Sequence, residues 1–393
     1  MPNLIDTAAE QSTPPPTKPV KPHHRRTAPD RSQRIRLIVQ SLFVLLNVFL
    51  CVQFYFFVRY FETSATGPHV ARPAGVDGWL PIAGLMNLRY LLATGRIPSI
   101  HPAAMVVFLI FIAISLFMKR AFCAWLCPVG TLSEYLWKAG RKLLGRNFTL
   151  PRWLDIPLRS IKYLLLAFFV FIIGNMSAAA LEDFMLQPYG ILADVKMLHF
   201  FTHMSTTALV VIAVLMLLSV FVKNFWCRYA CPYGAVMSLA SLASPLTIRR
   251  DTDACVDCGK CAKACPMDLP VDRLIQIRSI ECTACLECVA VCNTQNAIQF
   301  ALPPARLRPA AQHYPSAPAA GAAAVAAYPS APTVAQRWQG RTLQPLAAAI
   351  LIAALFCGGV GLARLTHHWQ TNISDDVYRE LIPHADEQTH PGF

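Results

Sequence analysis

Five long apolar stretches set the strongest limit on what this 393-residue chain can fold into. They cover residues 37–58, 102–118, 161–177, 205–222 and 344–363. A membrane-spanning helix needs about 20 apolar residues, and inside a bilayer every backbone polar group must find a partner within the protein. Only 15% of the residues are charged, against about 25% in soluble domains. The sequence therefore predicts a mainly α-helical membrane protein with about five transmembrane helices.

The positive charges indicate how the chain is oriented. Of the 35 Lys and Arg residues, 28 lie in the segments 1–36, 119–162 and 223–341, which alternate with segments that hold the other seven. Basic residues concentrate in the cytoplasmic loops of membrane proteins. We therefore expect a multi-pass protein of the bacterial inner membrane with a cytoplasmic N-terminus and a periplasmic C-terminus. Because this distribution explains the net charge of +13, we expect no nucleic-acid partner.

Composition divides the chain into six parts. In order, we predict a disordered basic cytoplasmic tail (1–36), a four-span membrane domain (37–245), a small cytoplasmic domain (250–300), an Ala/Pro-rich linker (301–342), a fifth transmembrane helix (343–364) and a periplasmic tail (365–393). The first apolar stretch is too long for a removed signal peptide, so we expect it to stay as an anchor. The Ala/Pro-rich segment cannot pack a core and predicts a semi-extended linker.

Eight of the 14 cysteines follow a spacing that is typical of one kind of cofactor. Residues 255–266 and 282–292 both contain C-x2-C-x2-C-x3-C, the pattern of bacterial ferredoxins with two [4Fe–4S] clusters. Three closely spaced thiolates hold one cluster, and the fourth cysteine holds the other. The predicted ligands are Cys255, Cys258, Cys261 and Cys292 for the first cluster and Cys265, Cys282, Cys285 and Cys288 for the second. Disulfides are disfavoured in the cytoplasm, and zinc ribbons use cysteine pairs rather than triplets.

A second cysteine motif occurs twice, each time at the end of an apolar stretch. Residues 119–130 read KRAFCAWLCPVG and residues 223–234 read KNFWCRYACPYG, so both match K-x-x-x-C-x-x-x-C-P-x-G. The apolar runs before the motifs align in the same register. Because each unit contains two membrane crossings, both units enter the membrane from the same side. This pattern predicts two parallel repeats related by an axis along the membrane normal, with both motifs on the cytoplasmic face.

The cysteines of this motif are Cys123, Cys127, Cys227 and Cys231. Cysteines four residues apart share one face of a helix, and the following proline either breaks that helix or starts a new one. Four thiols in one place suit a third iron–sulfur cluster, a soft metal such as Cu(I), or a redox-active thiol pair. Lys119 and Lys223, which open the motifs, either mark the membrane interface or favour the thiolate form. We predict a metal or redox role for the four cysteines.

The remaining candidate residues point to no further cofactor. Cys51 and Cys357 lie inside apolar stretches, where we expect them to be packing residues. His101, His199 and His203 lie near the outer ends of spans and are interpreted as solvated boundary residues, with contact to a quinol or ligation of haem as the alternatives. The sequence contains no nucleotide-binding loop, dinucleotide glycine fingerprint or C-x-x-C-H haem attachment motif.

The combination of spans, two C-x3-C-P motifs and a double-cluster segment resembles a known family. Over residues 37–300 the chain resembles the NapH/NosR/MauN-type membrane polyferredoxins, and CcoG shares the same core. The resemblance implies an inner-membrane electron-transfer protein with cytoplasmic iron–sulfur clusters. NapH-like members are associated with quinol oxidation and pass electrons toward periplasmic reductases. By this resemblance the expected partners are the quinone pool and a periplasmic redox protein or maturation system, which would make the chain a component of a quinol dehydrogenase.

Members of the family differ outside this core. NosR-like members carry a periplasmic flavin-binding domain, and CcoG-like members end in an immunoglobulin-like domain; the segments before residue 37 and after residue 364 are too short for either. The NapH-like interpretation therefore fits best. Two alternatives stay open: a copper reductase or assembly factor of the CcoG type, in which the four motif cysteines handle copper, and a redox-sensing regulatory membrane protein.

Overall fold

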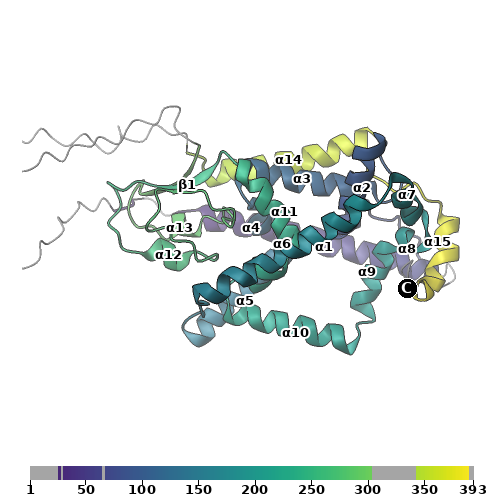
Figure 1. Cartoon of the computed structure of the whole chain (residues 1–393), viewed down its shortest axis with the longest axis horizontal. Helices are drawn as coiled ribbons and strands as arrows, with labels where there is room; N and C mark the ends of the chain where they lie inside the picture. The colour runs from purple at the N-terminus through teal and green to yellow at the C-terminus, as the bar shows by residue number, and fades with distance from the viewer. Residues whose placement is uncertain (1–24, 28–29, 64–66, 303–341, 389–393) are drawn as a thin grey trace, which may run out of the picture.

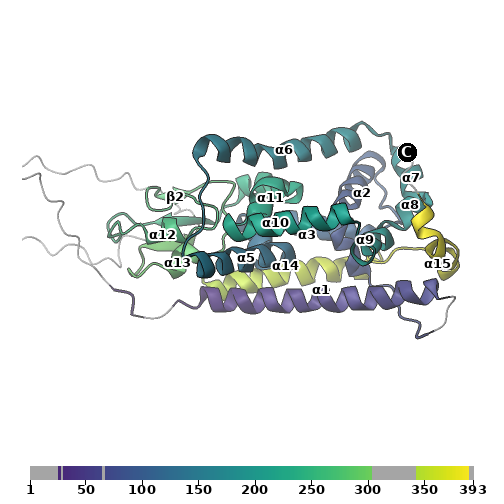
Figure 2. The same ribbon diagram turned by 90° about the horizontal axis from the view of Figure 1, so that it is seen from below.

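A computed structural model describes residues 25–27, 30–63, 67–302 and 342–388. Most of the predicted N-terminal tail and of the predicted linker lies outside these residues. The described part is mainly helical, as predicted, and elongated (Figure 1). A small module with short strands lies at one end of the long axis, and a group of short helices lies at the other (Figures 1 and 2).

Each of the five predicted apolar stretches lies within one helix, apart from one or two residues at its ends. The helices are α1 (Ser32–Glu62), α3 (Pro102–Met118), α6 (Arg152–Asn175), α10 (Thr206–Phe221) and α14 (Pro345–Leu365). Among the described residues, three of these, α1, α6 and α14, are long and apolar enough to cross a membrane alone. The helix α10 passes the same test only together with α9 (Ala193–Thr202), from which it is bent by 79°, and α3 has 17 residues. Figure 2 shows α1 and α14 side by side along one edge, with α6 along the opposite edge.

The first helix begins earlier than the predicted span. Its N-terminal turns contain Arg36 and Gln40, which are buried because they bond to polar groups of the neighbouring segment. Arg36 Nη1 donates to Glu134 at 2.7 Å, and Gln40 Nε2 donates to the carbonyl oxygen of Ala124 at 2.9 Å. The last residues of the predicted disordered tail are therefore helical.

Most of the remaining helices form two sets, one toward each end of the long axis (Figures 1 and 2). The set far from the strands comprises η1 (Ala74–Trp79), α2 (Pro81–Thr94), α7 (Ala178–Leu186), α8 (Pro188–Ile191), α9, α15 (Asp375–Leu381) and η5 (Ile382–Glu387). The set near the strands comprises α4 (Ala121–Trp125), α5 (Pro128–Leu144), η2 (Trp226–Ala230), α11 (Pro232–Ala240) and η3 (Ser241–Ala243). The repeated cysteine motifs belong to this second set.

The small module contains a three-stranded antiparallel sheet and two short helices. Its elements are β1 (Thr247–Arg250), α12 (Lys260–Ala264), β2 (Gln276–Ile277), α13 (Glu287–Ala290) and β3 (Ile298–Ala301). The strand order is β2-β1-β3, and Ile248 of β1 pairs with Ile277 on one side and with Phe300 on the other. The module therefore has the extent of the predicted cytoplasmic domain.

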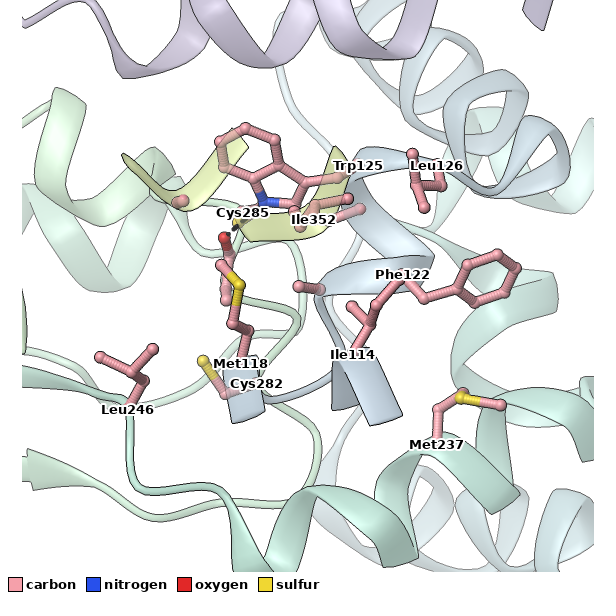
Figure 3. Close-up of a cluster of buried hydrophobic side chains, with 14 of the residues drawn as sticks. Ile114, Met118, Phe122, Trp125, Leu126, Met237, Leu246, Cys282, Cys285 and Ile352 are labelled. Carbon is pink, nitrogen blue, oxygen red and sulfur yellow. Dashed lines mark hydrogen bonds between the residues drawn. The ribbon is translucent and has the colours of Figure 1, made fainter. Parts of the chain in front are cut away.

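One hydrophobic core joins the module to the membrane helices. It runs from Ile114 and Met118 of α3 through Trp125 of α4 to Cys282 and Cys285 of the module. Figure 3 shows apolar side chains of α3, α4 and the module in one region of the structure. Since burial of apolar surface stabilises contacts in proportion to area, the module is a packed part of the molecule rather than a tethered one.

The prediction for the two isolated cysteines is wrong. Cys51 of α1 and Cys357 of α14 are exposed rather than packed in the core. Both lie on helices that are long and apolar enough to span a membrane. A thiol is a small apolar group that hydrocarbon tolerates, so an apolar segment places it on the outer surface of the bundle as readily as inside.

Candidate functional site

The module places its eight cysteines in two groups. In one group, Cys265, Cys282, Cys285 and Cys288 line a common small cavity and are all buried. Burial raises the pKa of Cys265 and of Cys282 to about 11 and that of Cys285 to about 12. The fourth cysteine of the first run thus lies with the first three cysteines of the second run.

The other group combines the first three cysteines of the first run with the fourth cysteine of the second run. Burial raises the pKa of Cys292, and the adjacent thiols of Cys255 and Cys258 raise it further. Burial also raises the pKa of Cys261 to about 11, with a smaller contribution from Cys255. Cys292, the last residue of the second run, therefore lies beside the first run. This crossing is the geometry that the predicted ligand assignment requires.

The two runs share one backbone conformation. Asp257 and Gly259 have positive φ values of 53° and 69°, and the equivalent residues of the second run, Ala284 and Leu286, have 48° and 60°. Left-handed residues turn the chain sharply, so successive cysteines of each triplet point to the same side. Gly259 is suited to this conformation by its lack of a side chain, whereas no sequence pattern indicates a positive φ at Ala284 and Leu286.

The second candidate site is the thiol quartet, which we define as Cys123, Cys127, Cys227 and Cys231. Burial raises the pKa of Cys127 to about 12, and the thiols of Cys123 and Cys231 contribute to the increase. The pKa of Cys227 is raised well above its ordinary value by burial and by the other three thiols. The two distant motifs therefore meet at one place, as the repeat predicted.

Local geometry explains why each motif ends in C-P-x-G. Pro128 and Pro232 occupy the first turn of α5 and α11, where a proline is compatible with a helix. Each preceding cysteine caps its helix: the N–H of Gly130 donates to Cys127 Sγ at 3.4 Å, and the N–H of Gly234 donates to Cys231 Sγ at 3.3 Å. The proline thus starts a helix instead of breaking one.

The glycine of each motif lies close to other atoms of the protein. A Cβ atom on Gly130 would lie 2.2 Å from the carbonyl oxygen of Cys123, which is closer than any allowed contact. On Gly234 the nearest atom would be Arg120 Nη2 at 2.9 Å, and the carbonyl oxygen of Cys227 would lie at 3.5 Å. Gly130 therefore lets α5 pack against the first cysteine of its own pair, whereas Gly234 leaves room for the Arg120 side chain.

The two motif lysines bond to the module and to η3 instead of to the quartet. Lys119 Nζ donates to the carbonyl oxygens of Ser241 at 3.2 Å and Arg278 at 3.3 Å. Lys223 Nζ donates to the carbonyl oxygen of Cys265 at 3.3 Å and to Asp268 at 3.0 Å. The idea that these lysines favour thiolates of the quartet is therefore wrong, because their charges are engaged elsewhere.

The positive charge next to the quartet belongs to Arg120, which the sequence analysis missed. Its Nη2 donates to the carbonyl oxygen of Cys227 at 3.3 Å, and its Nη1 donates to Glu281 at 2.7 Å. Lys162 of α6 binds the same carboxylate at 2.6 Å, and Tyr163 donates to it at 2.8 Å. Two buried cations thus share Glu281, the residue before Cys282.

Direct hydrogen bonds connect the quartet to the module. The N–H of Arg120 donates to the carbonyl oxygen of Cys282 at 3.2 Å. The indole N–H of Trp125, which lies between the two cysteines of the first motif, donates to the carbonyl oxygen of Ala284 at 3.0 Å. Figure 3 shows the Trp125 ring directed at the segment that carries Cys285. The quartet and the second cysteine run are therefore held as one unit.

A cavity of about 1020 Å³ extends from the quartet into the helical part. All four quartet cysteines and Tyr233 line one part of it, and Arg72 and Trp369 line another. Its wall along α1 runs from Phe43 to Gln53, which corresponds to about 15 Å of helix. Most of the lining is apolar, so the cavity suits a long hydrophobic ligand.

The cavity is bordered by side chains on the outer surface of α1. Leu46 and Phe49 both line it, and they are 41% and 63% exposed. Both residues lie on α1, which is long and apolar enough to span a membrane. A ligand dissolved in the membrane would therefore have a short path into the cavity.

Arg72, which lines the cavity, belongs to a buried charged cluster with Asp77, His101 and Asp194. Arg72 is paired with both carboxylates, and His101 Nδ1 lies 2.9 Å from Asp77 Oδ1. Burial alone would lower the pKa of His101, but the neighbouring Asp77 carboxylate raises it. Burial alone would raise the pKa of Asp77, but Arg72 and His101 lower it. The interpretation of His101 as a solvated boundary residue is therefore wrong, because it is 2% exposed.

The other two histidines lie farther along the same end of the molecule. His203 is exposed, as predicted, whereas only 11% of the His199 side chain is exposed. His199 lies between two carboxylates, with Nδ1 2.7 Å from Asp386 and Nε2 3.1 Å from Glu62. Neither histidine lines the cavity.

Comparison with known families matches both cysteine sites. The family described as "4Fe-4S binding domain" matches residues 100–147 and 204–249, which contain the two motifs of the quartet. The family described as "4Fe-4S dicluster domain" matches residues 247–293, which contain the two ferredoxin runs. No solved structure matches the chain.

Several curated proteins are similar to the chain over long segments. The putative electron transport protein YccM of Escherichia coli is 46% identical over 350 residues, which are 89% of this chain and 90% of that protein. The ferredoxin-type protein NapH of Escherichia coli is 28% identical over 53% of this chain and 71% of its own length. Protein NirI of Paracoccus denitrificans is 30% identical over 56% of this chain and 32% of its own length. On these similarities and on both iron–sulfur family matches, the chain belongs to the NapH/NosR/MauN-type membrane polyferredoxins.

Proposed function

We propose that this iron–sulfur electron transport protein relays electrons in the inner membrane between the quinone pool and a redox partner on the periplasmic side. One observation carries the proposal. The thiol quartet lies at the junction of the large apolar cavity and the module, and hydrogen bonds from Arg120 and Trp125 join it to the second cysteine run. A membrane-soluble redox ligand in the cavity would therefore be close to an unbroken series of cysteine sites.

The donor groups fit three iron–sulfur clusters. Cys255, Cys258, Cys261 and Cys292 would hold one [4Fe–4S] cluster, Cys265, Cys282, Cys285 and Cys288 would hold the second, and Cys123, Cys127, Cys227 and Cys231 would hold a third. When bound, such clusters accept and release single electrons. The support is the chemistry of each set: four thiols converge, all but Cys258 are at least partly buried, and metal binding displaces the thiol protons that burial otherwise retains.

The surrounding residues stabilise thiolate-rich sites and fix their positions. Backbone N–H groups of Gly130, Gly234 and Leu269 donate to cysteine sulfurs, which spreads negative charge away from the sulfur. Arg120 supplies positive charge beside the quartet while Glu281 holds its guanidinium in place. These groups set the orientation and the redox potential of whatever the cysteines bind.

The cavity supports an isoprenoid quinone as the membrane ligand. Its apolar wall and its border at the exposed residues Leu46 and Phe49 suit a hydrophobic tail. Polar side chains that could bond to a quinone head group lie in the same lining, among them Asn47, Gln53 and Arg72. The predicted orientation places the module in the cytoplasm and the opposite end of the molecule at the periplasmic side, where a redox partner would dock.

Reduction by a quinol tests the proposal. Anaerobically purified full-length protein in lipid nanodiscs is mixed with a menaquinol analogue, and cluster reduction is followed by EPR and by visible absorbance. We expect reduction in the wild type, and slower reduction in Gly78→Leu, which fills the cavity. Gly174→Leu is the matched control, because Gly174 has open space around it. Clusters that dithionite reduces but that exchange electrons with neither quinol nor quinone would contradict the quinone proposal.

The same preparation distinguishes a copper-handling protein from an iron–sulfur relay. If the quartet handled copper, metal analysis would find copper that disappears when Cys127 and Cys231 are replaced by serine, with the iron content unchanged. We expect the reverse, a loss of iron and no change in copper. Cys51→Ser is the matched control, since Cys51 lies on the outer surface of α1.

A further inference from the structure

We propose that His199, His203 and Asp386 form a binding site for a divalent transition-metal ion, with Zn²⁺ as the reference ion, at the end of the molecule opposite the cysteine sites. One ligand atom from each of the three residues lies within 4.8 Å of the others. The residues come from α9 and from η5, near the C-terminal end of the described chain. Figures 1 and 2 place α9 and α15, which precedes η5, at the end remote from the strands.

The two histidines are arranged as helical metal ligands commonly are. They are four residues apart, at the last turn of α9 and at its C-cap, so that both side chains lie on one face. The ring centroids are 5.4 Å apart and the ring planes are inclined by 73°. Pairs of histidines with this spacing on one helix face bind zinc in metalloproteins.

Packing, not chance contact, brings the carboxylate to the histidines. The segment that carries Asp386 is anchored by Tyr378, Ile382 and Ala385, which are buried against α1 and α9. The Tyr378 ring packs edge-on against Phe57 of α1, with centroids 5.3 Å apart. Because its neighbours are fixed in this way, Asp386 is held next to His199 although its own side chain is 74% exposed.

A fourth residue supplies the outer interaction that metal-binding histidines usually have. His199 Nδ1 faces Asp386 Oδ1 at 2.7 Å, and His199 Nε2 faces Glu62 Oε1 at 3.1 Å. An ion that replaced the proton between Nδ1 and Oδ1 would separate these atoms to about 3.3 Å, the spacing of two ligands in a tetrahedral zinc site. Glu62 would then accept the Nε2 proton and fix the ring orientation, as carboxylates do beside zinc-bound histidines.

The donor set selects the class of ion. Imidazole nitrogens favour Zn²⁺, Cu²⁺ and Ni²⁺ over Ca²⁺ and Mg²⁺, which prefer oxygen ligands alone. Three protein ligands leave the fourth position for water or for a ligand from another molecule. Bound metal would fasten the C-terminal segment to α1 and α9.

Zinc titration of the full-length protein with its clusters intact tests the site. Competition with a chromophoric chelator gives the Zn²⁺ stoichiometry and Kd of the wild type, His203→Ala and His384→Ala. His384 is the matched control, an exposed histidine on the same C-terminal segment. We expect the wild type and H384A to bind one more Zn²⁺ ion than H203A. Glu62→Gln should weaken this binding about 10- to 100-fold, because the ring loses its outer partner.

A second readout follows the C-terminal segment itself. Hydrogen exchange of the amides in Ile382–Glu387 should slow on addition of Zn²⁺ in the wild type and H384A, and stay unchanged in H203A. Iron content is measured in every sample, so that zinc bound by cysteines without clusters is recognised. Equal Zn²⁺ binding by H203A and the wild type, or no exchange protection in the wild type, would overturn the proposal.

Discussion

The backbone N–H of Arg120 donates a hydrogen bond of 3.2 Å to the carbonyl oxygen of Cys282. This bond joins the segment that carries Cys123 to the segment that begins the second ferredoxin run. The Arg120 side chain strengthens the junction, because its guanidinium reaches both Glu281 and the carbonyl oxygen of Cys227. A single residue therefore contacts both repeats of the quartet and the module.

The buried carboxylate at this junction should be important for stability. Glu281→Gln leaves the Arg120 and Lys162 cations buried without an anionic partner, which typically costs about 3–5 kcal/mol. Thermal unfolding of the detergent-solubilised protein should show the loss. Asp376→Asn is the control: it removes an exposed ion pair with Arg379, and such pairs contribute up to about 1 kcal/mol. Equal unfolding temperatures for the two variants would show that the junction does not depend on this charge.

The indole of Trp125 should contribute to the stability of the protein through its hydrogen bond as well as through its volume. Trp125→Phe keeps an aromatic ring but leaves the buried carbonyl oxygen of Ala284 without its donor, at a cost of about 1–3 kcal/mol. Trp153→Phe tests the same change at a site that is 76% exposed, where we expect little effect. Denaturant unfolding followed by fluorescence measures both. A larger loss at Trp153 would contradict the role given to Trp125.

The glycine of the first motif should be necessary for the geometry of the quartet. Gly130→Ala places a methyl group 2.2 Å from the carbonyl oxygen of Cys123, so the helix that follows the motif must move. We expect the variant to lose about four irons per chain while the two ferredoxin clusters remain. Gly174→Ala, at an open position of α6, should keep the wild-type iron content. Full iron content in G130A would rule out the proposed quartet geometry.

Acid should weaken the contact between α1 and α5 through Glu134. Although burial opposes ionisation, the Arg36 guanidinium, with Lys138, keeps the pKa of Glu134 below its ordinary value. A carboxyl group whose pKa is lower in the folded than in the unfolded protein stabilises the folded state. This stabilisation is complete above the unfolded pKa of about 4.3 and is lost as the pH falls through the folded pKa. The stability difference between the wild type and Glu134→Gln should therefore be constant above about pH 5 and shrink below pH 4. A difference that grows on acidification would contradict this assignment.

The elements that follow from local pattern were predictable from the sequence. Each apolar stretch became a helix because its residues favour that state in a low-dielectric surrounding. The crossing of Cys265 and Cys292 between the two groups follows from spacing alone, since a longer gap carries the fourth cysteine away from its triplet. The meeting of the two motifs was expected because the sequence predicts parallel repeats, which would bring equivalent positions to one side of the membrane.

The features that the sequence did not reveal all depend on long-range contacts. His101 is buried because Arg72, Asp77 and Asp194 converge on it from two other segments, which no local pattern indicates. The role of Arg120 depends on Glu281, which is 161 residues away in the sequence and is brought beside it by the fold. Cys51 faces outward because the side of α1 that packs inward is set by its neighbours, and an evenly apolar helix has no sequence signal for that choice.

The iron and acid-labile sulfide content of anaerobically purified protein tests the central claim most directly. The account predicts about twelve irons and twelve sulfides per chain, about four for each of three clusters. A variant with Cys127 and Cys231 replaced by serine should retain about eight of each, while Cys51→Ser should retain about twelve. About eight irons in the wild type, unchanged by the quartet substitutions, would contradict a cluster at the quartet and with it the proposed relay to the membrane cavity.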